Sequence, residues 1–265
     1  MSLFHINYYS QALAKITDIY AVAPDDVNPM FTEGNKEYER PTKLLILLHG
    51  YSGNASDWIT GSPIRELAGK YNLAVVMPCG DNSFYLDAKH TGGKYQTYVG
   101  EELVRYARKL FNLSDKKEDT IIGGFSMGGY GAIHTGFAYP DTFSKVIALS
   151  SANFVDDLHK MADDNPIANR AYYELCFGDL NEAANTLVNP RVQVETLQKE
   201  GKTVPSVWMA CGTEDFGYDN NVKLHEMLKE HEVDVTYHEG PGEHNWTFWN
   251  SCLEPSLKWM LDVEK

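Results

Sequence analysis

The sequence predicts one α/β domain built on a mainly parallel, doubly wound sheet. Residues 44–48 form a continuous apolar run, typical of a strand that is buried on both faces. Strand-like and helix-like segments then alternate along the chain, as parallel strands with helical crossovers require. The 265 residues contain no repeat, low-complexity segment or linker, so they suit a single domain over 1–265.

The elements follow from periodicity, taken from the N-terminus. Residues 3–9 and 13–22 alternate apolar and polar side chains, which predicts two antiparallel, half-exposed strands, followed by a polar loop over 24–42. Further strands are expected over 44–48, 73–78, 120–123, 144–150, 204–211 and 233–238. Helices are expected over 63–71, 95–111, 128–138, 218–231 and 246–262.

Residues 152–190 are too long for one crossover between strands. They mix polar loop with a helical segment near 168–176. Ligands of open α/β sheets bind outside the carboxyl ends of the strands. We therefore expect 152–190 to be a small insertion over the active site.

Composition and charge narrow the classes of partner. Asp and Glu number 37 against 23 Lys and Arg, a formal charge of −14 that repels nucleic acid and anionic membranes. No apolar run approaches the roughly 18 residues that span a bilayer. Because the N-terminus also lacks the pattern of a signal peptide, we expect a cytoplasmic protein. The four cysteines lack metal-ligand spacing, and neither a metal nor a cofactor is expected.

The motif G-x-S-x-G occurs between a predicted strand and a predicted helix. Its members are Gly124, Ser126 and Gly128, in the strand-turn-helix context that presents a nucleophilic serine. Such a turn is strained, and residues two positions either side crowd it unless they lack a Cβ. The N-terminus of the helix favours developing negative charge. Ser126 is therefore the predicted nucleophile.

A nucleophilic serine needs a base and an acid that orients the base. In the α/β-hydrolase fold the chain order is nucleophile, acid, histidine. His244 follows the last predicted strand in a Gly/Pro loop, which makes it the predicted base. Asp215 follows the preceding strand and is the predicted acid, with Glu214 as its rival; both also fit as acids at the start of a helix.

Two backbone N–H groups are predicted to form the oxyanion hole. Met127 follows the nucleophile, and Tyr51 lies in the loop after the buried strand 44–48, where Gly50 permits close approach. His49 is expected to hold this loop rather than to carry protons. Four aromatic residues near the active loops are expected to wall the pocket: Tyr85, Phe154, Phe216 and Trp246.

Six motifs in chain order resemble the esterase D-like branch of the α/β-hydrolases, above all the tributyrin esterases and carbohydrate esterase family 1. They are HGYSGN (49–54), MPCGDNSFY (77–85), YQTYVGEEL (95–103), GFSMGGYGA (124–132), CGTEDF (211–216) and HNWTFW (244–249). The resemblance implies serine hydrolysis of acyl or feruloyl esters without metal or cofactor. Residues 84–88 are similar to S-formylglutathione hydrolases, but those enzymes share a Leu-Thr-Cys-Thr loop where this chain has YSGN at 51–54.

The sequence therefore predicts a serine carboxylesterase that acts on small short-chain acyl or feruloyl esters, including esters of sugars. A thioesterase or acyltransferase with the same triad, as in the S-formylglutathione hydrolases, is an alternative. An inactive binding module is another, although the intact set of Ser126, Asp215 and His244 argues against it. The aromatic N-terminal strands are expected to expose an edge for a homo-oligomer.

Overall fold

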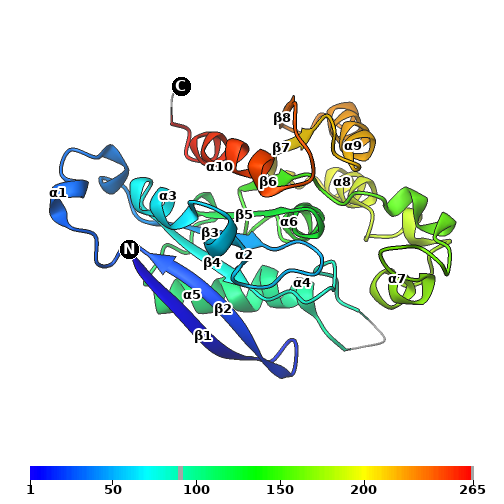
Figure 1. Ribbon diagram of the computed structural model, residues 1–265, viewed down its shortest axis with the longest axis horizontal. Coiled ribbons are helices and arrows are strands. Elements are labelled where there is room, and N and C mark those ends of the chain that lie inside the picture. The colour runs from blue at the N-terminus through cyan, green and yellow to red at the C-terminus, as the bar shows by residue number, and fades with distance from the viewer. Residues whose placement is uncertain (89–91, 264–265) are drawn as a thin grey trace.

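Eight strands form one sheet in the order β1-β2-β4-β3-β5-β6-β7-β8 in the computed structural model, which describes residues 1–88 and 92–263 (Figure 1). β1 pairs antiparallel with β2, and β2 pairs antiparallel with β4, while all later pairs are parallel. The strands are β1 (Ser2–Ser10), β2 (Lys15–Ala23), β3 (Lys43–Leu48), β4 (Leu73–Pro78), β5 (Thr120–Phe125), β6 (Lys145–Leu149), β7 (Ser206–Gly212) and β8 (Val235–Gly240).

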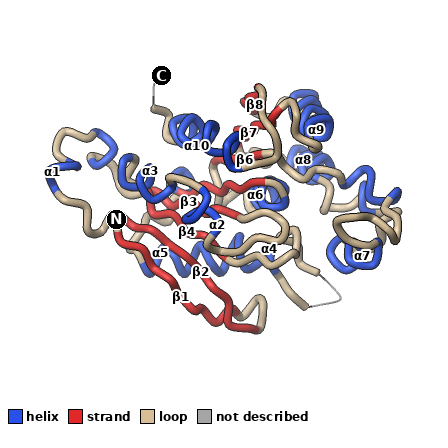
Figure 2. Tube along the Cα trace, viewed as in Figure 1, coloured by secondary structure: helices blue, strands red, loops and turns tan. Residues whose placement is uncertain are grey.

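Helices cover both faces of this sheet (Figure 2). α3 (Ile64–Lys70) and α10 (Trp246–Met260) pack on one face. α5 (Leu103–Leu110), α6 (Met127–Ala138), α8 (Pro190–Lys199) and α9 (Tyr218–Glu230) pack on the other. Alternate residues of β3 face the two layers: Leu45 belongs to the first core, and Leu44 and Ile46 belong to the second. The predicted α/β-hydrolase fold with its doubly wound sheet and two antiparallel N-terminal strands is confirmed.

In three of the expected segments the structure contains short helices or turns that the sequence analysis did not predict. The polar loop 24–42 contains α1 (Pro29–Thr32) and a 3₁₀ turn (Lys36–Tyr38), and α2 (Asp57–Gly61) precedes α3. The expected helix 95–111 is α4 (Tyr95–Thr97), a π-helical turn (Tyr98–Glu102) and α5 in succession. The stretch 152–190 holds 3₁₀ turns (Val155–Lys160, Ala183–Asn185) around α7 (Arg170–Phe177), and α8, which was not expected, follows it.

None of the helices within the described residues combines the length and apolarity that crossing a bilayer requires.

Candidate active site

Ser126 occupies a strained turn between β5 and α6. Its φ of +55° and ψ of −120° are unusual for a residue with a side chain. The backbone around it is held firmly: its N–H donates to the Leu149 carbonyl at 2.9 Å, and its own carbonyl accepts from Tyr130 and Ala152 at 3.1 and 3.0 Å. Strain of this kind persists only where surrounding contacts over-determine the conformation.

Glycines make this turn sterically feasible. A Cβ on Gly124 would lie 2.3 Å from the carbonyl oxygen of Gly128, and a Cβ on Gly128 would lie 2.4 Å from that of Leu48. Both contacts are with backbone, which cannot rotate away. The reason for the two glycines of the motif is thus confirmed: β5, α6 and the end of β3 approach too closely for any side chain.

His244 and Asp215 meet beyond the ends of two neighbouring strands. Asp215 follows β7, His244 follows β8, and the imidazole Nδ1 lies 2.8 Å from Asp215 Oδ2. Because an ionised carboxylate only accepts, Nδ1–H is the donor in this hydrogen bond, and Nε2 is the ring nitrogen that Asp215 does not engage.

The environment of Asp215 favours its charged form. Burial of the carboxylate opposes ionisation, but hydrogen bonds from His244 and from the Gly217 N–H, at 2.7 Å to Oδ1, outweigh it. The pKa of Asp215 therefore lies below its usual range, and the carboxylate is ionised at neutral pH.

Glu214, the rival acid, holds the loop of His244 instead. Its Oε2 accepts from the Gly242 N–H, and its own N–H donates to the Gly242 carbonyl at 3.0 Å. The structure thus brings Asp215, and not Glu214, to the imidazole.

Ser126 and His244 line one cavity of about 440 Å³ at the carboxyl ends of the strands. Tyr51 and Met127 line it too, and among the described residues neither backbone N–H has a partner within the chain. A Cβ on Gly50 would lie 3.4 Å from Ser126 Cβ, so the loop that carries Tyr51 runs directly beside the serine.

His49 anchors that loop. Its Nε2 accepts from the Gly80 N–H at 2.8 Å, and its Nδ1–H donates to the Gly50 carbonyl at 2.7 Å. Burial lowers the pKa of His49, which keeps the ring neutral. The ring therefore has the structural position expected from the sequence.

Of the four aromatic residues expected in the pocket wall, Phe154 and Phe216 line the cavity. Trp246 packs behind it, with its ring centroid 4.8 Å from that of Phe125. The prediction that Tyr85 lines the pocket wall is wrong. Tyr85 is fully buried, and its hydroxyl donates to the His49 carbonyl at 3.1 Å. Phe84 and Tyr85 both have positive φ, at +53° and +56°, and this turn places Phe84 in the cavity wall instead.

The sequence analysis missed two residues that lie beside the pair of Asp215 and His244. The Trp249 indole N–H donates to Ser150 Oγ at 3.0 Å, and Ser150 helps to lower the pKa of the Asp215 carboxyl. The Trp249 ring meets His244 edge to face, with centroids 5.1 Å apart. Trp249 belongs to the recognised HNWTFW motif, but Ser150 had no comparable signal.

The stretch 152–190 supplies the opposite wall of the cavity. Besides Phe154, it contributes six residues: Ala152, Asn153, Met161, Asn165, Ile167 and Tyr173. The expected placement of 152–190 beside the active site is consistent with this lining.

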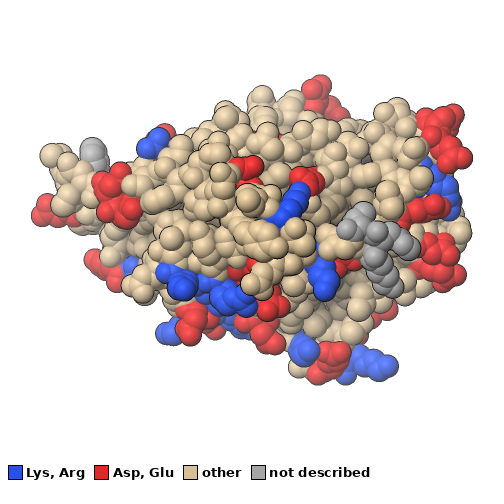
Figure 3. All heavy atoms as spheres, turned by 90° about the horizontal axis from the view of Figure 1, so that it is seen from below, with Lys and Arg blue, Asp and Glu red and all other residues tan. Residues whose placement is uncertain are grey.

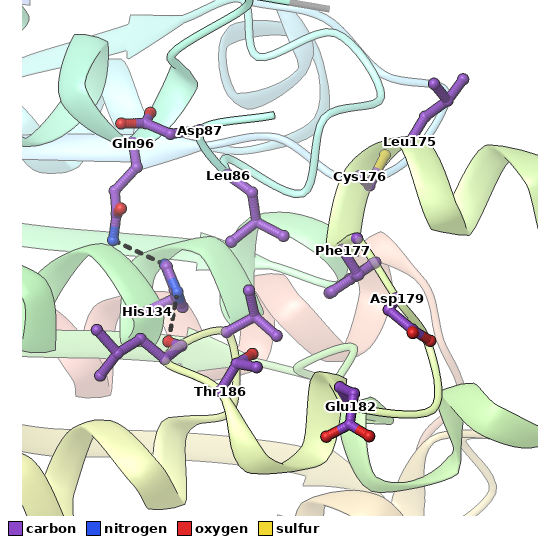
Figure 4. A pocket seen from close by; sticks show the side chains of 13 residues that line it. Leu86, Asp87, Gln96, His134, Leu175, Cys176, Phe177, Asp179, Glu182 and Thr186 are labelled. Atoms are coloured by element: carbon purple, nitrogen blue, oxygen red, sulfur yellow. Dashed lines mark hydrogen bonds between the residues drawn. The ribbon is translucent and has the colours of Figure 1, made fainter. Parts of the chain in front are cut away.

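A second cavity, of about 620 Å³, lies between α6 and the end of α7 (Figure 4). His134 borders it, with Nδ1 accepting from Gln96 Nε2 at 2.9 Å and Nε2–H donating to the Leu187 carbonyl at 3.0 Å. Burial lowers the pKa of His134 to about 4, so the ring is neutral and both nitrogens are occupied. No group of acids, histidines and cysteines suited to a metal occurs within residues 1–88 and 92–263.

Known proteins resemble this chain over nearly its whole length. The family described as "Putative esterase" matches residues 31–260. An acetyl esterase of Caldicellulosiruptor saccharolyticus is 39% identical over 265 residues, covering 99% of both chains. Two Staphylococcus aureus structures are each 28% identical and cover 98% of both chains: the fluorophosphonate-binding serine hydrolase FphF, with a TM-score of 0.85, and the S-formylglutathione hydrolase FrmB, with 0.83. The chain therefore belongs to this esterase family and is a carboxylesterase.

Proposed function

We propose that this carboxylesterase hydrolyses esters of short acyl groups through Ser126, His244 and Asp215. The observation that carries the proposal is the single cavity shared by Ser126 and His244, with Asp215 hydrogen-bonded to Nδ1 and Nε2 left as the base. The strained turn also exposes the serine at the N-terminus of α6.

The reaction follows in two halves. His244 Nε2 takes the Ser126 proton as Oγ attacks the ester carbonyl, and the Met127 and Tyr51 N–H groups bind the oxyanion. The imidazolium, stabilised by Asp215, gives its proton to the leaving oxygen, and the alcohol departs. Water activated by the same histidine then attacks the acyl-enzyme, which releases the acid and restores the serine.

The relatives support a short acyl group. The 39% identical relative is named an acetyl esterase. The rings of Phe84, Phe154 and Tyr173 line the same cavity and favour feruloyl esters as a second substrate group.

The cavity is less suited to a charged thioester. Among the described residues that line it, none is Lys, Arg, Asp or Glu. S-Formylglutathione is a net anion at neutral pH, and the protein itself carries a formal charge of −14. Both facts favour a neutral ester as substrate. Because the chain resembles FrmB, S-formylglutathione is included in the test below.

Hydrolysis of p-nitrophenyl acetate, butyrate and octanoate, methyl ferulate and S-formylglutathione tests the proposal, with Ser126→Ala as control. We expect the acetate and butyrate to be cleaved fastest, and Ser126→Ala to lower kcat by more than about a thousandfold. Ester turnover retained by Ser126→Ala would refute the mechanism. A preference for S-formylglutathione would refute the substrate class alone, and acyl transfer that outruns hydrolysis would identify an acyltransferase.

A further inference from the structure

The loop 49–53, which carries the candidate oxyanion donor of Tyr51, is held at both ends by the neighbouring segment 80–82. At one end the Gly80 N–H donates to the His49 ring. At the other end Asn82 Oδ1 accepts from the Ser52 N–H at 2.8 Å. The Asn82 side chain is therefore bonded to the peptide group that directly follows Tyr51.

Ser52 has an unusual backbone conformation. Its φ is +64°, and it is the third residue of a turn that the Gly53 N–H closes by donating to the Gly50 carbonyl at 3.1 Å. Glycine or asparagine is favoured at such a position, because most side chains make a positive φ costly. Turning over the peptide group between Tyr51 and Ser52 would relieve this strain, but it would also break the hydrogen bond to Asn82. Asn82 thus stabilises the strained form of the turn.

Asn82 is itself held by α7. Its backbone carbonyl accepts from the Tyr172 hydroxyl, and Cys176 Sγ lies 3.6 Å from the same oxygen. Burial raises the pKa of Tyr172, so the phenol stays protonated and remains a donor. The Tyr172 ring also meets the Tyr51 ring edge to face, with centroids 5.8 Å apart. One tyrosine of the stretch 152–190 therefore contacts both the loop 49–53 and the residue that holds it.

We propose that Asn82 is a positioning residue that holds the Tyr51 N–H in the orientation that binds the oxyanion. Asn82 lies outside the set of residues that line the cavity, so it acts through the peptide group that follows Tyr51. Oxyanion donors are effective because they are aimed in advance at the place where charge develops. This inference rests on the proposed function and adds a residue on which one of the two donors depends.

Two measurements report on the oxyanion hole. The first is kcat and KM for p-nitrophenyl acetate. The second is the Ki of trifluoroacetone, whose carbonyl carbon bonds to Ser126 Oγ while the serine proton passes to His244. The carbonyl oxygen of the ketone thereby becomes an anion that the oxyanion hole binds. Ki does not depend on the fraction of protein that is active, so it separates a misaimed donor from partial unfolding.

We expect Asn82→Ala to lower kcat and kcat/KM equally, and to raise the Ki of trifluoroacetone by the same factor. Removal of a donor costs about 10²–10³ in kcat, and a donor that is only misaimed should cost less, about three- to thirtyfold. Asn82→Ala combined with Ser52→Gly should recover most of both losses, because glycine adopts a positive φ without help. Tyr172→Phe keeps the ring but loses the hydroxyl, and should act in the same direction by less.

Asn28→Ala is the matched control. Asn28 is also exposed, and its Oδ1 accepts from the Met30 N–H at 2.9 Å. It caps α1, which lies at the opposite end of the molecule from α7 (Figure 1). This variant should leave kcat, KM and Ki unchanged. Thermal unfolding of each variant checks that the fold is kept.

Three results would overturn the inference while leaving the proposed function intact. Wild-type kcat and Ki in Asn82→Ala would show that the donor needs no such support. A lower kcat with an unchanged Ki, or a rise in KM alone, would place the effect outside the oxyanion hole. A failure of Ser52→Gly to restore activity to Asn82→Ala would show that Asn82 does not act through the turn. Wild-type protein that neither cleaves the ester nor binds trifluoroacetone would instead refute the proposed function, and the inference with it.

Discussion

Ser150 connects the candidate acid to a tryptophan that also contacts the candidate base. Its hydroxyl accepts from the Trp249 indole and helps to lower the pKa of Asp215, while the Trp249 ring meets the His244 ring edge to face. Asp215 in turn accepts a hydrogen bond from Nδ1 of His244, so the four side chains are linked to one another. The orientation of the imidazole thus depends on two groups that need not touch the substrate.

We expect Ser150→Ala to move the acidic limb of the kcat/KM pH profile to higher pH. Without Ser150 the Asp215 carboxylate is less stabilised and its pKa rises, so the Asp215–His244 pair takes up a proton at higher pH. A hydrogen bond of about 1 kcal/mol sets an upper bound of roughly 0.7 pH unit. The profile with p-nitrophenyl acetate measures the shift.

Two variants sharpen this measurement. Trp249→Phe keeps a ring against His244 but removes the indole N–H, and should shift the limb in the same direction by less. Ser151→Ala makes the same chemical change one residue later, where the hydroxyl has no partner among the described residues, and should leave the limb unmoved. A lower kcat with an unmoved limb in Ser150→Ala would contradict the prediction.

Sequence patterns yield candidate residues where chemistry dictates the residue type. Ser126, Asp215 and His244 were predicted from motif and chain order, and the structure places the last two in contact. Tyr85 was misplaced because two consecutive positive φ angles reverse which of two adjacent aromatic rings faces the cavity. The spacing of apolar residues carries no information about such a turn. Ser150 was missed because it belongs to no motif that the sequence analysis recognised.

The β1–β2 hairpin is attached to the helix before α5 through one carboxylate. Glu102 accepts hydrogen bonds from Ser10 Oγ at 2.7 Å and from the N–H groups of Gln11 and Ala12 at 2.8 and 3.1 Å, as well as from the Tyr8 hydroxyl. Glu102 ends a π-helical turn, whose extra residue rotates the following helix relative to a regular one. The turn thereby sets which side chain faces the tip of the hairpin.

Replacing Glu102 by Gln should lower the free energy of unfolding at pH 7 by about 1–3 kcal/mol, because an amide N–H then faces N–H donors. Burial opposes ionisation of Glu102, but these hydrogen bonds outweigh it and hold its pKa below the usual range. The stability that ionised Glu102 contributes is therefore fully present above the pKa of about 4.3 that it has in the unfolded chain. This contribution is lost as the pH falls through the lower pKa that Glu102 has in the folded protein. Urea unfolding at pH 7 and at acidic pH measures it.

Glu101→Gln is the matched control for this element. Glu101 is exposed on the same π-helical turn, and its Oε1 lies 3.6 Å from Nη1 of Arg105. An exposed ion pair of this kind stabilises a protein by less than about 1 kcal/mol. Equal losses in the two variants at pH 7 would show that Glu102 has no special part in anchoring the hairpin.

Elements with a long, uniform pattern were predicted closely, as the strand over 73–78 shows. The π-helical turn was not, because apolar spacing over 95–111 is compatible with an unbroken helix. α8 was missed although Asn189 caps it and Pro190 begins it. Its buried face includes the polar Gln193, which weakens the apolar period that sequence analysis relies on.

At one edge the sheet ends in β1, a strand that contains no Asp, Glu, Lys or Arg. On β1 and the adjacent β2, Tyr9 and Ile16 lie opposite each other and are 61% and 67% exposed. Figure 3 looks onto the side where β1 and β2 lie, and broad areas of it carry no charged side chain. Long edges without charges favour pairing with another chain.

We expect the protein to associate with a second copy through β1, since antiparallel pairing of identical strands is two-fold symmetric. Light scattering across protein concentrations should show a dimer that Tyr9→Lys weakens by placing like charges at the contact. Leu110→Lys adds the same charge to α5 and should leave the mass unchanged. A wild-type monomer at every concentration would contradict this expectation.

The stretch 152–190 has a consequence for how such an enzyme diversifies. Ser126, Asp215 and His244 follow the ends of β5, β7 and β8, whereas Phe154, Met161, Ile167 and Tyr173 come from one separate excursion of the chain. Exchanging that stretch would alter the shape of the cavity without touching the strand ends that carry the proposed triad. The cavity wall and the proposed triad therefore come from different stretches of one polypeptide, so a change in one need not change the other.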